Sequence, residues 1–416
     1  MATHPPLSNA ELLHRAQQAR QAGDLARAID LLQHAVRQPG AGAAAFNMLG
    51  LSLIAARRPA EAIGPLRRAI AIDPGSAPLH LNLADALREA GDAPAALDAL
   101  DWALERDPYL LPALLWKGQL LEASGRTDDA LRAYRALLKT IPEGPPPPPM
   151  ADAIANARRM VAADGAARLA RLEAALVEHG ADALSPRARA YSEQLCGTRR
   201  IYQPQPTGPH FPFLPALEYF DDAQFPWFAT LEAAYPVIRD ELFALWREDV
   251  PGFDPYVRFD PTMPVNQWSE LNHSPRWSAF FLWRDGMRVE ENIRRCPGTA
   301  AAMEALPLLD VPGKSPTVIF SILAPRTRIP AHTGVSNTRA TVHLPLVVPE
   351  GCRFRVGGET RPWVEGRAWA FDDTIEHEAW NDSDRPRAIL IIDAWNPFLD
   401  EGEKAVVRTA APHMRL

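Results

Sequence analysis

The chain has 416 residues, of which 47% are hydrophobic and 23% charged, and its formal net charge is −7. These values are globular and exclude a disordered or fibrous chain, and the length predicts two or three domains. The charges of both signs are interspersed without a long basic run, so neither nucleic acid nor an anionic membrane is expected as a partner.

The cysteines and the N-terminal residues indicate the compartment. Cys196, Cys296 and Cys352 are widely spaced and odd in number, which favours free thiols in a reducing environment. The first 20 residues lack the cationic start and apolar run typical of a secretory signal. No stretch approaches the roughly 18 consecutive apolar residues of a membrane-spanning helix. We therefore expect a cytoplasmic protein without a membrane partner.

Residues 1–142 are predicted to form an all-α array of about four 34-residue repeats. Two residue types recur with this spacing: Ala28, Ala62, Ala96 and Ala130, and Pro74, Pro108 and Pro142. Each unit divides into two amphipathic helices, and the small residues Gly50, Ala84 and Gly118 allow the paired helices to approach closely. The period and the pattern resemble the tetratricopeptide repeat.

Two uses of this array remain open. It is either a passive spacer or a superhelix whose concave groove binds an extended peptide or protein substrate. The groove candidates come from the first helix of each unit: Asn47, Leu51, Asn82 and Trp116.

A proline run at 143–150, EGPPPPPM, predicts a stiff polyproline II linker and a domain boundary. Residues 151–200 are expected to form a helical connector, with helix-like composition over 151–196, and another helix is expected over 229–246. Beyond residue 250 the pattern changes to short strand-like runs separated by turn signals, which favours a sandwich or barrel. These predicted strands are 317–324, 341–348, 352–356, 367–371 and 386–395.

Three of the eleven histidines, His332, His343 and His377, lie among the predicted strands. His332 is expected in a loop before strand 341–348, and His377 follows strand 367–371. Two histidines with this separation suit a jelly-roll metal centre, and imidazole suits iron with positions left for a chelating cosubstrate and oxygen. The common iron site has a carboxylate two residues after the first histidine, where this chain has Gly334.

Strand alternation predicts a polar wall beside these histidines. Arg387 shares a strand face with Ile389 and Ile391, where its charge is costly unless an anion meets it, and a guanidinium can pair with one end of a dicarboxylate. On strand 341–348, one face is predicted to line a pocket and the other to lie in the core. These faces are Arg339, Thr341 and His343, and Leu344, Leu346 and Val348, respectively. From the residues alone, both a metal-dependent oxygenase and a β-domain without a metal remain open.

Residues 318–397 contain the motifs HTG…N…R…HL and FDD…EHE…N, and they resemble the catalytic domain of aspartyl/asparaginyl β-hydroxylases. HFPFLPALEYF and WSAFFLWRDGMRVEENIRRCP extend the resemblance back to about residue 200. Members of that family are Fe(II)- and 2-oxoglutarate-dependent dioxygenases on a double-stranded β-helix, which tetratricopeptide repeats can precede. The resemblance implies a multidomain α + β chain with an N-terminal superhelix. It also implies an oxygenase domain over 201–416, with a jelly-roll or cupin-like core at about 317–397 and flanking helices.

The resemblance also implies the ligands of the metal. The family binds iron through two histidines and has glycine at the carboxylate position, so His332 and His377 are expected as the only protein ligands. Asp372, Asp373 and Glu376 are alternative ligands, but they are expected instead to cap the turn and orient neighbouring groups.

Further roles carry over by position. Ser321, His343 and Arg387 match the contacts to 2-oxoglutarate, and Arg339 matches an arginine that holds the substrate's carboxyl or amide. The chain departs from the family pattern at Thr341, where a further cosubstrate-binding arginine is expected, and at Asn272, which takes the place of a second substrate-binding arginine.

The expected reaction uses Fe(II), 2-oxoglutarate and O2 to hydroxylate a carbon of an Asp- or Asn-type residue, in a peptide or protein recruited by the repeats. The departures leave the hydroxylated residue open. One alternative is a hydroxylase of a free or carrier-bound small molecule, with the repeats used for partner docking. A second alternative is a non-enzymatic repeat scaffold.

Overall fold

The computed structural model describes residues 7–141, 144–180, 184–247 and 252–413. The chain divides into two compact units, Met1–Thr198 and Arg199–Leu416. None of the helices in the described ranges is long and apolar enough to cross a membrane.

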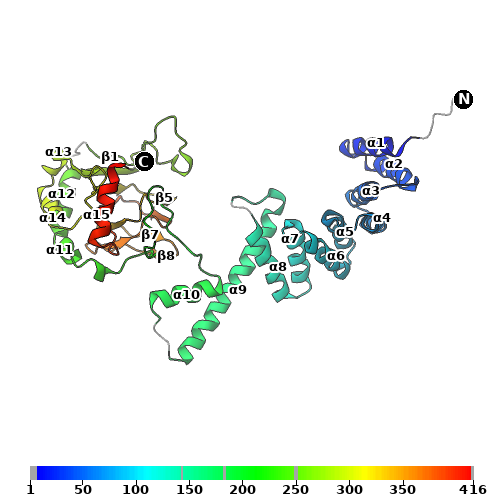
Figure 1. The fold of residues 1–416 in the computed structure, drawn as a ribbon, viewed down its shortest axis with the longest axis horizontal. Coiled ribbons are helices and arrows are strands. Elements are labelled where there is room, and N and C mark those ends of the chain that lie inside the picture. The colour runs from blue at the N-terminus through cyan, green and yellow to red at the C-terminus, as the bar shows by residue number, and fades with distance from the viewer. Residues whose placement is uncertain (1–6, 142–143, 181–183, 248–251, 414–416) are drawn as a thin grey trace. The chain divides into compact units, whose positions relative to one another are not determined.

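The first unit begins with four successive pairs of antiparallel helices (Figure 1). The pairs are α1 (Asn9–Gln21) with α2 (Leu25–Arg37), α3 (Ala43–Ala55) with α4 (Pro59–Ile72), α5 (Ala77–Glu89) with α6 (Ala93–Arg106), and α7 (Leu111–Ala123) with α8 (Thr127–Thr140). The predicted repeat array is therefore confirmed.

Small residues set the distance between the paired helices. The recurring alanines Ala28, Ala62, Ala96 and Ala130 are all fully buried. A Cβ added at Gly50 would collide with the side chain of Leu66 on the partner helix, and one added at Gly118 would collide with the Tyr134 ring. The 34-residue period therefore reflects close packing of the two helices, which requires small residues at corresponding positions of each pair.

The region after the repeats differs from the prediction. Pro148–Met150 form the 3₁₀ turn η1, followed by α9 (Ala151–Glu178) and α10 (Pro186–Cys196). Ile154 and Ala157 of α9 are fully buried in the same core as Leu115 and Tyr134. The proline run, of which Glu143 lies outside the described residues, therefore does not separate two compact units. The boundary falls instead between Thr198 and Arg199, because the apolar face of α9 extends the core of the array.

The second unit contains two antiparallel sheets. The seven-stranded sheet has the order β1 (Asp254–Pro255), β2 (Trp277–Arg284), β4 (Val318–Leu323), β11 (Arg387–Trp395), β6 (Arg339–Val347), β9 (Trp369–Phe371), with β3 (Met287–Arg288) paired to β2. The four-stranded sheet has the order β5 (Thr327–His332), β10 (His377–Asn381), β7 (Cys352–Val356), β8 (Glu359–Arg361). From β4 to β11 the chain alternates between the sheets, except at the β7–β8 hairpin. This topology confirms the predicted double-stranded β-helix.

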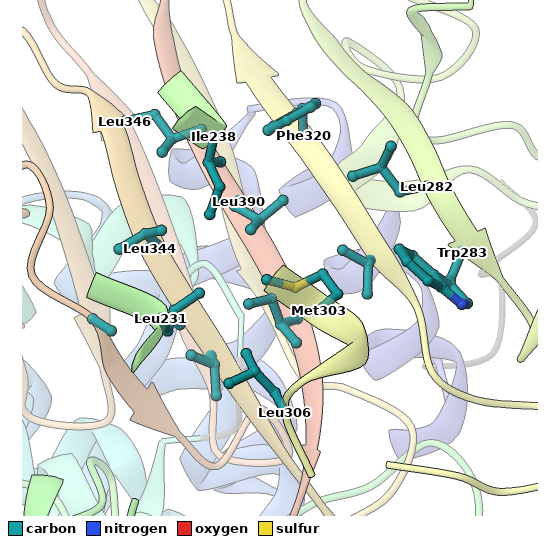
Figure 2. Packing of buried hydrophobic residues seen from close by; sticks show 14 of the residues in the cluster. Leu231, Ile238, Leu282, Trp283, Met303, Leu306, Phe320, Leu344, Leu346 and Leu390 are labelled. Atoms are coloured by element: carbon teal, nitrogen blue, oxygen red, sulfur yellow. The ribbon is translucent and has the colours of Figure 1, made fainter. Parts of the chain in front are cut away.

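Helices cover the outer face of the larger sheet. They include α11 (Phe228–Ala233), α12 (Tyr235–Arg247), α13 (Glu290–Ile293) and α14 (Pro297–Glu304), and α15 (Glu401–Ala410) follows the last strand. Figure 2 shows Leu231, Ile238 and Met303 from these helices beside Leu344 and Leu390 of the sheet. The short 3₁₀ turns η2 (Asp222–Gln224), η3 (Asn266–Trp268) and η4 (Ala411–His413) complete the unit. The outer face is thus filled with apolar side chains, so the polar side chains of the sheet's strands are left to the inner face, beside a second apolar cluster between the sheets.

The five predicted strands are found as β4, β6, β7, β9 and β11, whereas β2, β5 and β10 and the short strands β1, β3 and β8 were not predicted. The prediction of a single helix over 229–246 is wrong. The segment divides at Ala234 into α11 and α12, because Pro236 has no N–H to donate to a carbonyl one turn back.

We predict that Gly118→Ala lowers the free energy of unfolding by about 1–3 kcal/mol, because its methyl group overlaps the Tyr134 ring. This loss outweighs the gain of about 1 kcal/mol in helix propensity. The control is Gly64→Ala in α4, where an added Cβ meets no atom within 4 Å and stability should rise slightly. Urea unfolding followed by circular dichroism measures both, and a Gly118→Ala variant as stable as Gly64→Ala would contradict the prediction.

Candidate active site

A cavity of about 430 Å³ lies between the two sheets. Thr341 and His343 of β6 and Arg387, Ile389 and Ile391 of β11 line it. The alternation of each strand brings these residues to the inner face. The predicted alternation is therefore confirmed for both strands.

The opposite face of β6 agrees with the prediction at two positions of three. Leu344 and Leu346 lie in the outer cluster, against the helices. Val348 was wrongly placed with them: β6 ends at Val347, and Val348 lies against the hydrophobic cluster between the sheets.

The pairing of β5 with β10 brings two histidines together. The antiparallel register places His332 directly opposite His377, and their ring centroids are 4.0 Å apart. His332 is the last residue of β5, not part of a loop as predicted, and His377 is the first residue of β10. Strand pairing across 45 residues of chain therefore forms the pair.

The two imidazoles are oriented by backbone carbonyls. Nδ1 of His332 lies 2.8 Å from the Pro330 oxygen, and Nδ1 of His377 lies 3.0 Å from the Ile375 oxygen. A carbonyl only accepts, so each Nδ1 carries the proton and each Nε2 keeps its lone pair. Burial lowers the pKa of both rings, and that of His377 lies well below its ordinary value. Both histidines are thus neutral donors suited to a metal.

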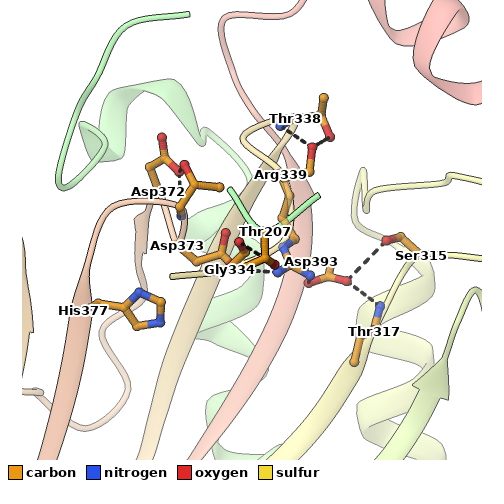
Figure 3. A network of polar contacts seen from close by, with 12 residues as sticks. Thr207, Ser315, Thr317, Gly334, Thr338, Arg339, Asp372, Asp373, His377 and Asp393 are labelled. Carbon is orange, nitrogen blue, oxygen red and sulfur yellow. Dashed lines mark hydrogen bonds and ion pairs between the residues drawn. The ribbon is translucent and has the colours of Figure 1, made fainter. Parts of the chain in front are cut away.

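Gly334 has no room for a side chain. An added Cβ would collide with the carboxylate of Asp373, and the Gly334 N–H donates to the Asp373 carbonyl at 2.6 Å. The Thr207 N–H donates to the Gly334 carbonyl at 2.9 Å, so a second segment holds this glycine in place. Figure 3 shows Gly334 and Asp373 beside His377. Position 334 therefore cannot supply a carboxylate while Asp373 occupies this space.

The three alternative carboxylates have other contacts. Asp372 accepts hydrogen bonds from the Thr374 N–H and hydroxyl, at 2.9 and 2.6 Å, and so caps its turn. Asp373 and Glu376 each form an ion pair with an arginine. In the described part of the chain, no group of three or more histidine, cysteine or acidic residues is arranged to hold a metal. These carboxylates are thus engaged elsewhere, whereas the Nε2 atoms of His332 and His377 keep their lone pairs.

Arg387 is a buried cation without an anion. Its side chain is 1% exposed, it forms no ion pair with any described residue, and its Nε and one Nη atom have no hydrogen-bond partner there. The Trp363 ring lies 4.8 Å from its Cζ, and burial lowers the pKa of the guanidinium to about 10. Such a charge is costly to bury alone, so the cavity wall is suited to an anionic group.

Ser321 and His343 line the same cavity with donors available. The Ser321 oxygen accepts from the Trp277 indole N–H at 3.0 Å, which leaves the hydroxyl proton free to donate. Nδ1 of His343 accepts from the Trp363 N–H at 3.3 Å, so its Nε2 carries the proton. Burial and the nearby Arg387 charge hold the His343 pKa well below its ordinary value, so the ring is neutral.

Arg339 differs from Arg387 because it is already neutralised. It forms ion pairs with Asp373 and with Asp393, the latter at 3.3 Å (Figure 3). Asp393 is held in turn by the Thr317 N–H at 2.9 Å. Burial opposes the charge of Arg339, but the two carboxylates outweigh it and raise its pKa. The guanidinium lines the cavity, but it carries little unbalanced charge toward a substrate.

The two departures from the family pattern have different surroundings. Thr341 lines the cavity, and its hydroxyl has no hydrogen-bond partner within the described ranges. Asn272 is not among the cavity-lining residues, and its side-chain oxygen accepts from the Phe259 N–H at 2.8 Å. Arg258, which the sequence analysis missed, lines the cavity and pairs with Asp254 at 2.6 Å. No motif or spacing in the sequence signals this position.

Comparison with known families agrees with the two units. Residues 232–397 match the family described as Aspartyl/Asparaginyl beta-hydroxylase, and residues 53–101 and 81–145 match Tetratricopeptide repeat families. Residues 232–397 of the C-terminal unit are therefore similar to the aspartyl/asparaginyl beta-hydroxylase family, and residues 53–145 of the N-terminal unit are similar to tetratricopeptide repeats. This confirms the resemblance predicted from the sequence.

Individual relatives match over part of their length. An ornithine lipid ester-linked acyl 2-hydroxylase of Rhizobium tropici is 38% identical over 184 residues, which are 43% of this chain and 60% of that protein. The human aspartyl/asparaginyl beta-hydroxylase is 36% identical over 172 residues, 41% of this chain and 21% of that protein. The chain thus covers less than two thirds of either relative. Among solved structures, MamA is similar over 32% of this chain and 78% of its own, with 23% identity and a TM-score of 0.31.

The Asp372 carboxyl predicts a pH dependence of stability. Burial raises its pKa to about 6, above the value of about 3.9 in an unfolded chain. A raised folded-state pKa gives stability that is present below the unfolded value and is lost as pH rises through 6. We expect wild type to lose about 2 kcal/mol relative to Asp372→Asn between pH 4 and pH 7, because the amide keeps an acceptor oxygen without titrating.

Urea unfolding of both proteins at the two pH values measures this difference. The exposed Asp384→Asn is the control for the loss of one charge. A stability difference between wild type and Asp372→Asn that does not change with pH would refute the prediction.

Proposed function

We propose that the C-terminal unit is an Fe(II)- and 2-oxoglutarate-dependent dioxygenase that hydroxylates a C–H bond of an organic substrate. One observation carries the proposal: a single cavity contains a histidine pair with free Nε2 lone pairs and a buried arginine without an anion. The family match and the hydroxylase names of both relatives agree with it.

His332 and His377 would hold the iron through their Nε2 atoms. Imidazole suits iron(II), and a two-histidine set leaves coordination positions for a chelating cosubstrate and dioxygen. Bound there, iron, 2-oxoglutarate and O2 would supply the oxidising power for the hydroxylation. The carbonyls of Pro330 and Ile375 keep the two rings in the required tautomer.

Arg387 would bind the distal carboxylate of 2-oxoglutarate. The ligand would neutralise a charge that has no counter-ion in the described residues, and a buried pair of this kind is strong because water does not screen it. The Ser321 hydroxyl and the His343 Nε2–H supply further donors, and the unpartnered Thr341 hydroxyl stands where the family has an arginine. Apolar side chains of the cluster between the sheets surround these groups.

One candidate substrate is an Asp- or Asn-type residue of a peptide or protein recruited by the repeats. The human relative is an aspartyl/asparaginyl beta-hydroxylase. Among the predicted groove residues, the Asn82 amide donates to Asn47 at 2.8 Å, and the Arg88 guanidinium lies 5.0 Å from the Trp116 ring centroid. These partly exposed polar and aromatic groups from successive repeats suit an extended chain.

A second candidate is a small molecule or lipid without such an acidic or amide group. Arg339 is balanced by Asp373 and Asp393, and the Asn272 side-chain oxygen is used by the backbone of its own domain. The arginine clamp of the family pattern is therefore weakened. The Rhizobium tropici relative is named as an acyl hydroxylase of a lipid. Both candidates are compatible with the proposed cytoplasmic location.

We predict that His377→Ala abolishes iron-dependent formation of succinate from 2-oxoglutarate. The remaining imidazole cannot hold the metal alone, so Fe(II) affinity should fall more than about 100-fold. Anaerobic equilibrium dialysis measures the affinity, and the exposed His34→Ala in α2 is the control. Succinate formation retained by His377→Ala would reject the ligand assignment.

We predict that Arg387→Ala raises the concentration of 2-oxoglutarate required for half-maximal turnover by about 30-fold or more, because removing one partner of a buried charge pair costs about 2–5 kcal/mol. Arg385→Ala is a matched control, since this arginine is exposed and only two residues away. If Arg385→Ala raised the requirement and Arg387→Ala did not, the carboxylate would bind at Arg385.

A further inference from the structure

A second cavity, of about 440 Å³, lies beside the candidate active site within the same unit. Thr317, Val335 and Arg339 line both cavities. The ion pairs of Arg339 with Asp373 and Asp393 fix this shared wall. The volume is in the range of small-molecule sites, so a molecule in the second cavity lies next to the proposed reaction centre.

The second cavity is lined by residues 209–211, 309–317 and 335–339, by helix α15 and by Asp285, and hydrogen bonds hold the first two segments. The Phe211 N–H donates to the Asn337 side chain at 2.7 Å, and the Asn337 amide donates back to the Phe211 carbonyl at 2.8 Å. The Leu309 N–H donates to the Asp393 carbonyl at 3.0 Å. Helix α15 closes another side. The apolar lining residues include Phe211, Leu309, Val311, Val335, Val406 and Ala410.

Helix α15 turns an uncharged face toward this cavity. Val406 lines it although its side chain is 62% exposed. The cations of the helix are engaged elsewhere, because Lys404 pairs with Glu401 and Arg408 pairs with Asp310. An apolar group that binds here would remove Val406 from water.

Three hydroxyl groups in the wall, those of Ser315, Ser336 and Thr338, already have hydrogen-bond partners. Ser336 and Thr338 hydrogen-bond to each other at 2.9 Å, and Ser315 donates to Asp393 at 3.4 Å. A peptide backbone would therefore find few partners for its N–H and C=O groups, and burying these without partners is costly. An unbranched hydrocarbon chain has no such requirement. Besides the ion-paired Arg339, the ionisable lining residues are His210, Asp285 and Lys314, all exposed, and a polar end would lie beside these three.

We propose that the second cavity binds the apolar chain of an amphiphilic substrate of the fatty-acyl class, whose reacting carbon lies in the first cavity. This inference rests on the proposed function and names its substrate class. It selects a chain-bearing small molecule over an Asp- or Asn-type residue.

The test uses full-length protein without iron or 2-oxoglutarate and follows the fluorescence of dansyl-labelled undecanoic acid. Wild type should bind the probe, and dodecanoate but not butyrate should displace it. Val406→Asp should raise the Kd about tenfold or more, because it places a charge in the apolar wall. Ala405→Asp adds the same charge on the same helix outside this cavity and should change the Kd less than about twofold.

A second pair of variants fills the cavity instead of charging it. Ala410→Phe should weaken binding of the probe, whereas Thr409→Phe, which lies outside the cavity, should not. If wild type does not bind the probe, or if the members of each pair have equal effects, the inference is overturned.

Turnover separates this inference from the proposed function. With Fe(II) and 2-oxoglutarate, dodecanoyl compounds with acid, ester or amide heads should raise succinate formation. Binding without stimulation by any of them overturns the substrate assignment, while His377-dependent succinate formation would still support the dioxygenase. Loss of the His377 dependence, with binding intact, rejects the proposed function itself.

Discussion

The site depends on the antiparallel register between β5 and β10. This register sets His332 opposite His377 and holds their ring centroids 4.0 Å apart. A shift of one residue would turn one ring to the other face of the sheet, because side chains alternate along a strand. The double-stranded β-helix protects this register, since β10 pairs with β5 on one side and with β7 on the other. The flanking helices contribute indirectly, by burying the outer face of the larger sheet.

The cavity contains two arginines with opposite electrostatic situations. Arg339 is enclosed by Asp373 and Asp393, and its positive charge is balanced within the protein. Arg387 is more deeply buried and lacks any such partner in the described chain. An anion entering the cavity therefore gains most at Arg387. Arg387 is therefore suited to binding an acidic cosubstrate, whereas Arg339 forms a fixed part of the wall. This favours substrates that are recognised without an arginine of unbalanced charge.

Glycine at position 334 and aspartate at position 373 are two parts of one packing arrangement. The Asp373 carboxylate fills the space that a side chain at 334 would need, and it does so because Arg339 holds it there. Position 334 therefore offers no free space for an acidic side chain. Introducing a carboxylate there would first displace Asp373 and leave Arg339 with one counter-ion fewer.

The sequence by itself determined the features that depend on local pattern. The 34-residue period records a contact between neighbouring helices, as at Gly118 and Tyr134, and strand alternation placed His343 and Arg387 on inner faces. Spacing together with the family resemblance nominated His332, His377 and Arg387 as site residues. Strands β5 and β10 were missed because they are short and carry proline or charged residues, so neither has the apolar alternation of an isolated strand.

Only the tertiary structure decided which distant groups meet. Helix α9 covers the last repeat and so extends the first unit. Arg258 reaches the first cavity from a segment outside the β-helix core, and α15 returns to the sheet to line the second cavity. The physical reason is the same in each case. Burial, ion pairing and steric exclusion act between atoms close in space, and spacing along the chain does not specify those neighbours until the sheets and helices are assembled.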